Sequence, residues 1–87
     1  MTVVHVPSPL HSYTKQQAKV DADGATLSAL LDDLDRRYPG FRFRVVDEQG
    51  RIRPTILIYV NQAVTRSLDT EVAGKDDVHI IAALSGG

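Results

Sequence analysis

One amphipathic helix is the feature that most constrains how this chain folds. Four leucines and a tyrosine recur at helical spacing and form one apolar stripe: Leu27, Leu30, Leu31, Leu34 and Tyr38. Thr26 is a suitable N-cap residue, and Pro39-Gly40 ends the helix. Nothing else in the 87 residues can bury this stripe except a sheet, so the helix must cover one sheet face.

The strands are predicted from alternating and β-branched segments at residues 2–6, 18–22, 56–60, 63–66 and 78–84. Between them we expect a turn through Gln17, a short turn at residues 41–46 packed on the core, and loops at 47–50 and 67–75, the last anchored by Leu68 and Val72. The first two strands can pair antiparallel, and the first can pair in parallel with the last. The predicted fold is therefore α+β, a β-grasp domain of residues 1–84 with a mixed four- to five-stranded sheet on one main helix.

Composition excludes several function classes. The net charge is −1, so no overall positive field draws the protein to nucleic acid, and no apolar run is long enough to span a bilayer. With no cysteine in the sequence, disulfides, a thiolate nucleophile and zinc–thiolate sites are excluded. The N-terminus lacks the apolar segment of a signal peptide, which makes a cytoplasmic location the expectation.

Arginine is concentrated in one part of the chain. Six arginines fall within eighteen residues, accompanied by Asp47 and Glu48: Arg36, Arg37, Arg42, Arg44, Arg51 and Arg53. We interpret this run mainly as a solvated face. A docking patch for an acidic partner is the alternative.

Strand parity predicts an apolar patch on the face of the sheet that the helix does not cover. Ile56, Ile58 and Val60 share one face of their strand, so Leu57 and Tyr59 lie on the other. By the same alternation, Ile81 and Ala83 lie on this open face in the last strand. Such patches often bind protein partners, so these four residues are predicted to dock partners. Ordinary exposed surface and self-association are the alternatives.

The chain ends in two glycines. Gly86-Gly87 follows the last strand after a single serine, so residues 85–87 are predicted to form a flexible tail. Residues without a Cβ can pass through a narrow channel and let the backbone approach a reacting group closely. Next to a β-grasp domain, this ending indicates that the C-terminal residues have a functional role. The alternative is a frayed end without a function.

Other candidate side chains give a weaker signal. His5 and His79 become neighbours on the open face if the first and last strands pair, but no acidic residue at ligand spacing supports them or His11 as a metal site. We therefore interpret the histidines as surface residues and expect no metal. Asp32, Asp33 and Asp35 are placed on the solvent side of the helix.

These features resemble the molybdopterin-synthase small subunit and thiamine sulfur-carrier family, which has the ubiquitin-like β-grasp fold. The resemblance covers nearly the whole chain and rests on four short segments: Thr26-Leu27, Tyr38-Pro39-Gly40, Ile58-Tyr59-Val60-Asn61 and Gly86-Gly87. The long segment of residues 41–54 is more similar to the carriers of cysteine synthesis and molybdopterin assembly. Ala83, Leu84 and Ser85 depart from the usual approach to the diglycine.

The resemblance implies a protein co-substrate and not an enzyme. An E1-like adenylating and sulfurtransferase enzyme would use ATP-Mg to adenylate Gly87, a sulfur donor would convert the adenylate to a thiocarboxylate, and a downstream biosynthetic enzyme would accept the sulfur. No cofactor is expected on the chain itself. In this scheme Gly86 provides clearance, and Ser85 with Leu84 sets how the tail enters a partner.

The sequence leaves other functions open. A ubiquitin-like modifier joined to other proteins through Gly87 shares the chemistry up to the adenylate, and a β-grasp interaction module with an idle tail needs none of it. Cysteine synthesis and molybdopterin assembly rank above other sulfur acceptors on segment length.

Overall fold

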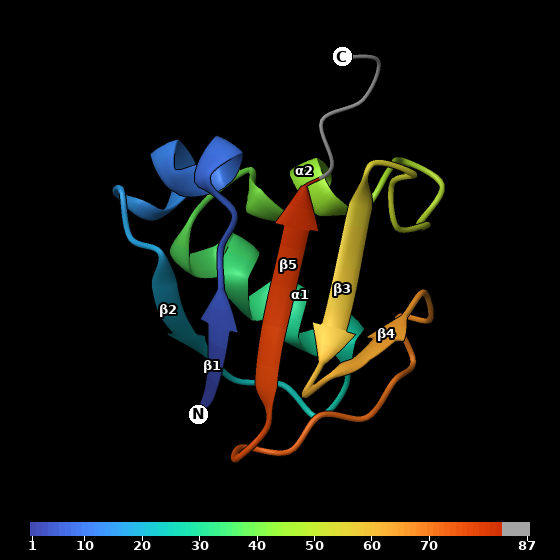
Figure 1. Ribbon diagram of the computed structural model, residues 1–87. Helices are drawn as coiled ribbons and strands as arrows, with labels where there is room; N and C mark the ends of the chain where they lie inside the picture. The colour runs from blue at the N-terminus through green and yellow to red at the C-terminus, as the bar shows by residue number, and fades with distance from the viewer. Residues whose placement is uncertain (83–87) are drawn as a thin grey trace.

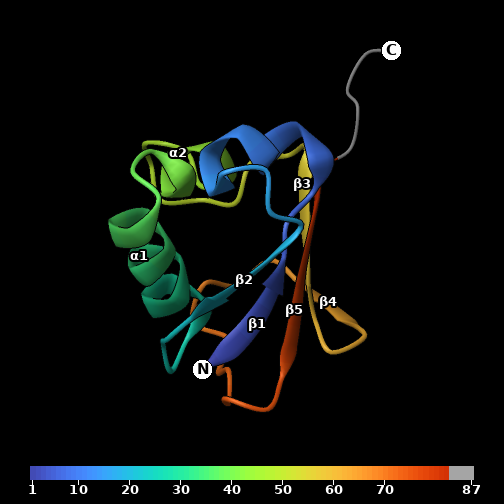
Figure 2. The ribbon, with the colours of Figure 1, turned by 90° about the vertical axis from the view of Figure 1, so that its left-hand side faces the viewer.

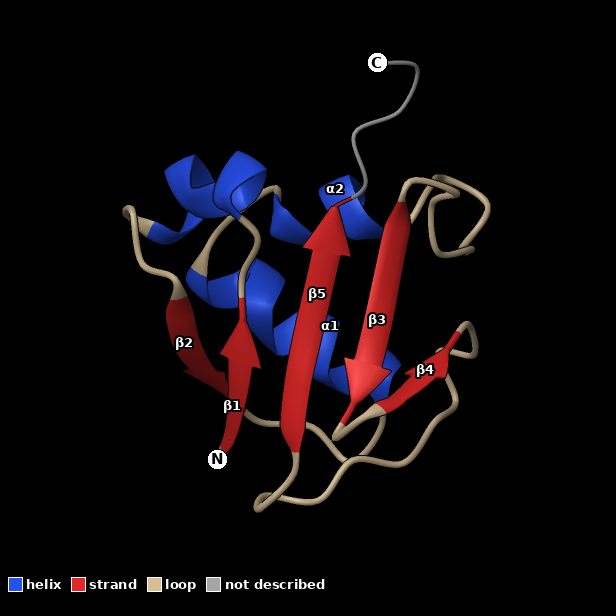
Figure 3. Ribbon diagram, viewed as in Figure 1, coloured by secondary structure: helices blue, strands red, loops and turns tan. Residues whose placement is uncertain are grey.

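The computed structural model describes residues 1–82, which form one mixed sheet covered by helices on one face (Figures 1 and 3). The five strands are β1 (Thr2–His5), β2 (Lys19–Ala22), β3 (Ile56–Val60), β4 (Ala63–Thr65) and β5 (Asp77–Ala82). Their order across the sheet is β2-β1-β5-β3-β4. β1 pairs with β5 in parallel, and the other neighbours pair antiparallel. The predicted β-grasp architecture is confirmed, with five strands.

Helix α1 (Leu27–Arg37) lies across the sheet and buries the leucine stripe (Figure 2). Its leucines are almost completely inaccessible, packed against inward-facing strand residues such as Ile58 and Ile80. The Thr26 hydroxyl accepts a hydrogen bond from the Ala29 N–H at 3.2 Å, as expected for an N-cap. Burial of this stripe is the main source of stability that the sheet and helix share.

Asp33 contradicts the sequence prediction of a solvent-facing carboxylate. It is only 5% exposed. Its Oδ2 accepts hydrogen bonds from the Asp23 backbone N–H and from Arg37 Nε, and its Oδ1 pairs with Arg36. The prediction was wrong because helical periodicity places a polar residue on the solvent side. It carries no information about the turn after β2, which folds back over this part of α1.

Two further helical segments replace predicted turns. The 3₁₀-helix η1 (Ser8–Thr14) has Pro9 in its first turn, where the missing N–H costs nothing, and buries Leu10. The short helix α2 (Phe41–Val45) buries Phe41 and Val45, which are one helical turn apart. Its middle residue Phe43 points to solvent and is 56% exposed, so the prediction that this segment packs on the core holds for only part of it.

The conformation of the turn after β3 explains why an asparagine, Asn61, stands there. Asn61 adopts a left-handed conformation (φ 59°), which asparagine tolerates better than most residues. Its backbone N–H donates to the Asp77 carbonyl at 2.7 Å, and its side-chain oxygen accepts from the Asp77 N–H at 3.1 Å. The β3–β4 turn is therefore attached to the start of β5, which aligns the central strands.

Candidate functional site

One face of the sheet carries none of the helices formed within residues 1–82 and presents a row of paired side chains. Figure 2 shows the helices on one side of the sheet and the other side bare. On this open face, Leu57 of β3 is paired with Ile81 of β5, and Tyr59 is paired with His79. The parity prediction for Leu57, Tyr59 and Ile81 is therefore confirmed as to position. Their predicted role in docking remains a prediction.

The open-face patch, as we name Leu57, Tyr59, Val64 and Ile81, is partly exposed. Ile81 is 42% exposed and Val64 is 53% exposed, whereas Leu57 and Tyr59 are half-buried by their neighbours. Val64 joins the patch because β4 pairs with β3 and sets it opposite Tyr59. Sequence reasoning missed Val64, although its place in a short strand next to a confident one offered the signal.

Two histidines border the patch. The rings of His5 and His79 are stacked with centroids 3.9 Å apart and planes 1° from parallel, and His5 Nε2 lies 3.8 Å from Asp77 Oδ1. Their predicted proximity is confirmed, since β1 and β5 pair in register at these residues. Within residues 1–82, no group of three or more His, Cys, Asp or Glu side chains is placed to hold a metal ion. His11 lies elsewhere, with its Nε2 2.8 Å from the Val6 carbonyl oxygen.

The C-terminal part of the predicted site lies outside the described residues: Ala83, Leu84, Ser85, Gly86 and Gly87. β5 ends at Ala82, which is paired with Ile56 at the start of β3. The Leu57–Ile81 pair is next in the ladder. The described part of the chain therefore ends, at Ala82, at the end of the sheet where the open-face patch begins.

Three carboxyl groups in residues 1–82 have a clearly lowered pKa, and each serves the fold. The pKa of Asp33 is lowered first by the hydrogen bond from the Asp23 N–H and then by Arg37 and Arg36. A hydrogen bond from the Arg51 N–H lowers the pKa of Asp47, and one from the Ala73 N–H lowers the pKa of Asp76. These groups lie on α1 and in loops, away from the open-face patch.

The predicted arginine run is a surface feature with several separate local contacts. Arg36 and Arg37 pair with Asp33. The guanidinium of Arg44 lies 5.2 Å from the centroid of the Tyr13 ring, and that of Arg53 lies 4.6 Å from the centroid of the Phe43 ring. Arg42 and Arg51 line a groove elsewhere on the surface, described below. In the described part of the chain, no helix has the length and apolar character needed to cross a membrane.

The chain matches a known family over almost its whole length. A sequence model of the ThiS family matches residues 4–87, which include the terminal diglycine. Sulfur carrier protein CysO of Mycobacterium tuberculosis is 36% identical over 89 residues, covering 97% of this chain and 96% of that protein.

Solved structures agree with this match. CysO in the crystal structure of the Amycolatopsis orientalis BexX/CysO complex is similar, with a TM-score of 0.92, 32% identity and full coverage of both chains. The crystal structure of SAMP1 from Haloferax volcanii has a TM-score of 0.78 at 25% identity, covering 99% of this chain and 98% of that one.

Proposed function

Because the chain belongs to the ThiS family, we propose that it is a sulfur carrier that works through the carboxylate of Gly87. The observation that carries this proposal is the family match, which runs through residue 87 and so includes Gly86 and Gly87. The name of the mycobacterial relative, sulfur carrier protein, supports the same activity. A carrier of this kind is a co-substrate for other enzymes and does not itself catalyse the transfer.

The proposed cycle begins on an E1-like activating enzyme, which uses ATP-Mg to join AMP to the Gly87 carboxylate and release pyrophosphate. The resulting acyl-adenylate is a mixed anhydride, so sulfide can attack its carbonyl carbon and displace AMP. A persulfide donor would first give an acyl disulfide, which a thiol then cleaves. Either route leaves a thiocarboxylate on Gly87. Since the chain has no cysteine, it offers the sulfur no thiol side chain as an alternative attachment site.

The open-face patch is the proposed docking surface for these enzymes. It is apolar, it carries no helix, and it lies beside the strand end from which the tail continues. An enzyme that grips Leu57, Tyr59 and Ile81, with Ala83 following, would hold the tail close to its own active site. A few residues supply most of the binding energy in many interfaces, and tyrosine, here Tyr59, is one of the types enriched among them.

We propose cysteine synthesis as the destination of the sulfur. The support is the similarity to the mycobacterial sulfur carrier protein CysO over nearly the whole of both chains. The complex in which the Amycolatopsis CysO was crystallised supports the view that such carriers bind other proteins directly. Molybdopterin assembly is the second candidate for the acceptor pathway.

Intact-protein mass spectrometry tests the carrier proposal. Protein purified from its own host should include a form in which one C-terminal oxygen is replaced by sulfur, located at Gly87 by fragmentation. A variant lacking Gly86-Gly87 is the matched control and should never carry this change. Complete absence of the sulfur-containing form, even with the activating enzyme co-expressed, would contradict the proposal.

A protein-modifier role is the second candidate, favoured by the similarity to SAMP1 of Haloferax volcanii, whose name stands for small archaeal modifier protein 1. In that case the same purification should yield other proteins joined through Gly87 to lysine side chains. If deletion of Gly86-Gly87 had no effect on the cell, both functions that use the tail would be excluded, leaving an interaction module.

A further inference from the structure

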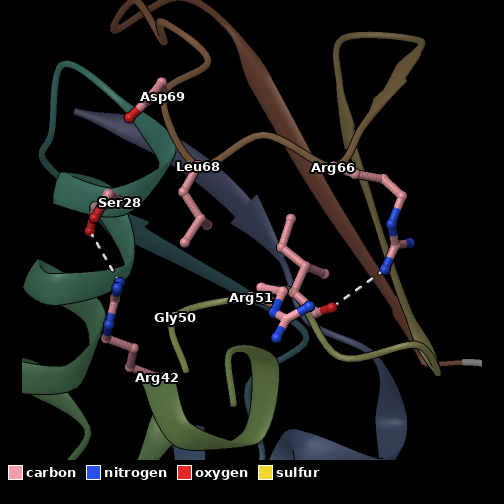
Figure 4. Close-up of a pocket in the computed structure, with 8 residues that line it drawn as sticks. Ser28, Arg42, Gly50, Arg51, Arg66, Leu68 and Asp69 are labelled. Atoms are coloured by element: carbon pink, nitrogen blue, oxygen red, sulfur yellow. Dashed lines mark hydrogen bonds between the residues drawn. The ribbon is translucent and has the colours of Figure 1, made fainter. Parts of the chain in front are cut away.

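A groove of about 540 Å³ lies on the helix side of the molecule, away from the open-face patch. Figure 4 shows that Ser28 of α1, Arg42 of α2 and Arg51 of the following loop surround it, together with Arg66 and Asp69 of the loop after β4. We name this feature the arginine groove. Three arginines from three separate segments of the chain, Arg42, Arg51 and Arg66, line this one groove.

The groove arginines are held mainly by neutral groups. Arg66 donates to the carbonyl oxygens of Ile56 and Ile52 at 3.3 and 3.2 Å. Arg51 donates to the Gln49 side-chain oxygen at 2.7 Å. Within residues 1–82, neither Arg51 nor Arg66 forms an ion pair with a carboxylate. Their guanidinium groups are thus oriented but keep most of their positive charge available for a ligand.

Arg42 is partly neutralised. Its Nη1 donates to the Ser28 carbonyl at 3.3 Å and lies 3.5 Å from Asp32 Oδ1. Asp69 adds a negative charge at the rim of the groove. The positive charge of Arg51 is also attracted by the Asp47 carboxylate. The charge balance around the opening nevertheless favours an anionic ligand close to Arg51 and Arg66, on the side of the groove away from Asp32.

The groove also has an apolar component. The side chains of Leu68 and Ile52 line it. Leu68 is only partly buried, whereas Ile52 is 5% exposed and belongs to the core. A lone phosphate would leave Leu68 uncovered and occupy a small part of the volume. An extended segment with carboxylates on either side of an aliphatic residue satisfies both components, because guanidinium groups bind carboxylates in planar, often paired hydrogen bonds.

We propose that the arginine groove binds an acidic peptide segment of a partner protein, with an aliphatic side chain against Leu68. This inference goes beyond sulfur transfer and does not depend on it. Since the groove and the open-face patch lie on different sides of the sheet, one protein can hold the groove while another engages the open face and the tail.

The test uses the full chain and a fluorescein-labelled peptide of sequence Asp-Glu-Leu-Asp-Glu. Binding is followed by fluorescence anisotropy at low salt and by amide shifts in the ¹⁵N spectrum. We expect shifts confined to the groove segments around residues 28, 42, 50–52 and 66–69. Affinity should fall as salt is added, since charge contacts at a surface are screened. The matched peptide with Asn and Gln in place of Asp and Glu should not bind.

Three single variants sharpen the test without disturbing the core. Arg51→Gln should weaken binding about three- to tenfold by removing one charge-assisted contact. Asp69→Asn should tighten binding, because it removes a repulsive charge from the rim. Arg44→Gln is the control, since Arg44 lies on Tyr13 outside the groove, and should leave affinity unchanged.

Several results would overturn the proposal. Equal weakening by Arg51→Gln and Arg44→Gln would indicate attraction to the general positive charge and no site. Shifts outside the groove segments, or no binding at all, would exclude it. Inorganic phosphate that bound at the same residues as tightly as the peptide would show a small-anion site instead.

Discussion

The two faces of the sheet are built from the same residue types but differ in how far their side chains are exposed. On the covered face, Ile58 and Ile80 are completely enclosed by α1 and the other core residues. On the open face, Leu57 and Ile81 come from the same strands, one position along, and meet solvent. The difference teaches that strand parity decides whether an apolar residue of β3 or β5 is enclosed in the core or left at the surface, where its role in docking is a proposal.

The neighbouring isoleucines of β5 should give the largest contrast. Ile80 is 2% exposed, so Ile80→Ala leaves a cavity and should lower the free energy of unfolding by about 2–5 kcal/mol. Ile81→Ala removes the same atoms from the open face and should cost less than about 1 kcal/mol. Urea denaturation of both variants measures the difference. Similar losses for the two would show that the open face is also part of the stabilising core.

A substitution at Gly24 tests how closely α1 packs against the turn after β2. A Cβ at this position would lie 2.3 Å from the backbone nitrogen of Leu30, so Gly24→Ala must push α1 away from the turn after β2. We expect a loss of about 1–3 kcal/mol in the free energy of unfolding. Gly74→Ala is the control, because its nearest contact would be an ordinary 3.8 Å. A thermal midpoint for Gly24→Ala equal to that of the control would refute the close packing.

Tyr59 tests the proposed role of the open face. Tyr59→Glu should raise the KM of the carrier with its activating enzyme about tenfold, a change of about 1.4 kcal/mol, because it places a charge in an apolar interface. The unfolding free energy should change little, since Tyr59 is only half-buried. Gln62→Glu adds the same charge in the exposed β3–β4 turn and should leave the KM unchanged. An unaltered KM for Tyr59→Glu would remove this residue from the docking surface.

The N-cap of α1 should have a smaller effect. Thr26→Ala removes the side-chain acceptor for the Ala29 N–H and should cost about 1 kcal/mol of unfolding free energy. Thr26→Ser keeps the acceptor and should recover most of the loss. If serine and alanine were equally destabilising, the methyl group of Thr26 and not its hydroxyl would be the stabilising part.

Acid should lower the free energy of unfolding gradually. The pKa values of Asp33, Asp47 and Asp76 lie below the ordinary 3.8 in the folded state, so the unfolded chain binds more protons than the folded one in that range. Their contribution is therefore complete above about pH 5 and is lost as the pH falls through the ordinary value and then through the lowered values. Urea midpoints measured at successive pH values should show the loss. Asp33→Asn should flatten this dependence, and an unchanged slope would exclude Asp33 as a contributor.

Much of the fold followed from local pattern. The leucine stripe located α1, and alternation located the strands and assigned Leu57, Tyr59 and Ile81 to the open face. The 3₁₀-helix η1 and helix α2 were missed because each is too short for a helical period to show. Phe43 was assigned to the core by its apolarity, but its position on α2 directs it to solvent, where it packs under Arg53.

Sequence alone determined that the leucine stripe is buried against a sheet and which strand positions remain on the second face. Those properties depend on spacing along the chain, which is visible in the letters. Only the tertiary structure decided that Asp33 is enclosed and that Arg42, Arg51 and Arg66 border one groove. Each of these depends on where distant segments meet, and a charged or polar residue gives no local sign of the neighbour it will have.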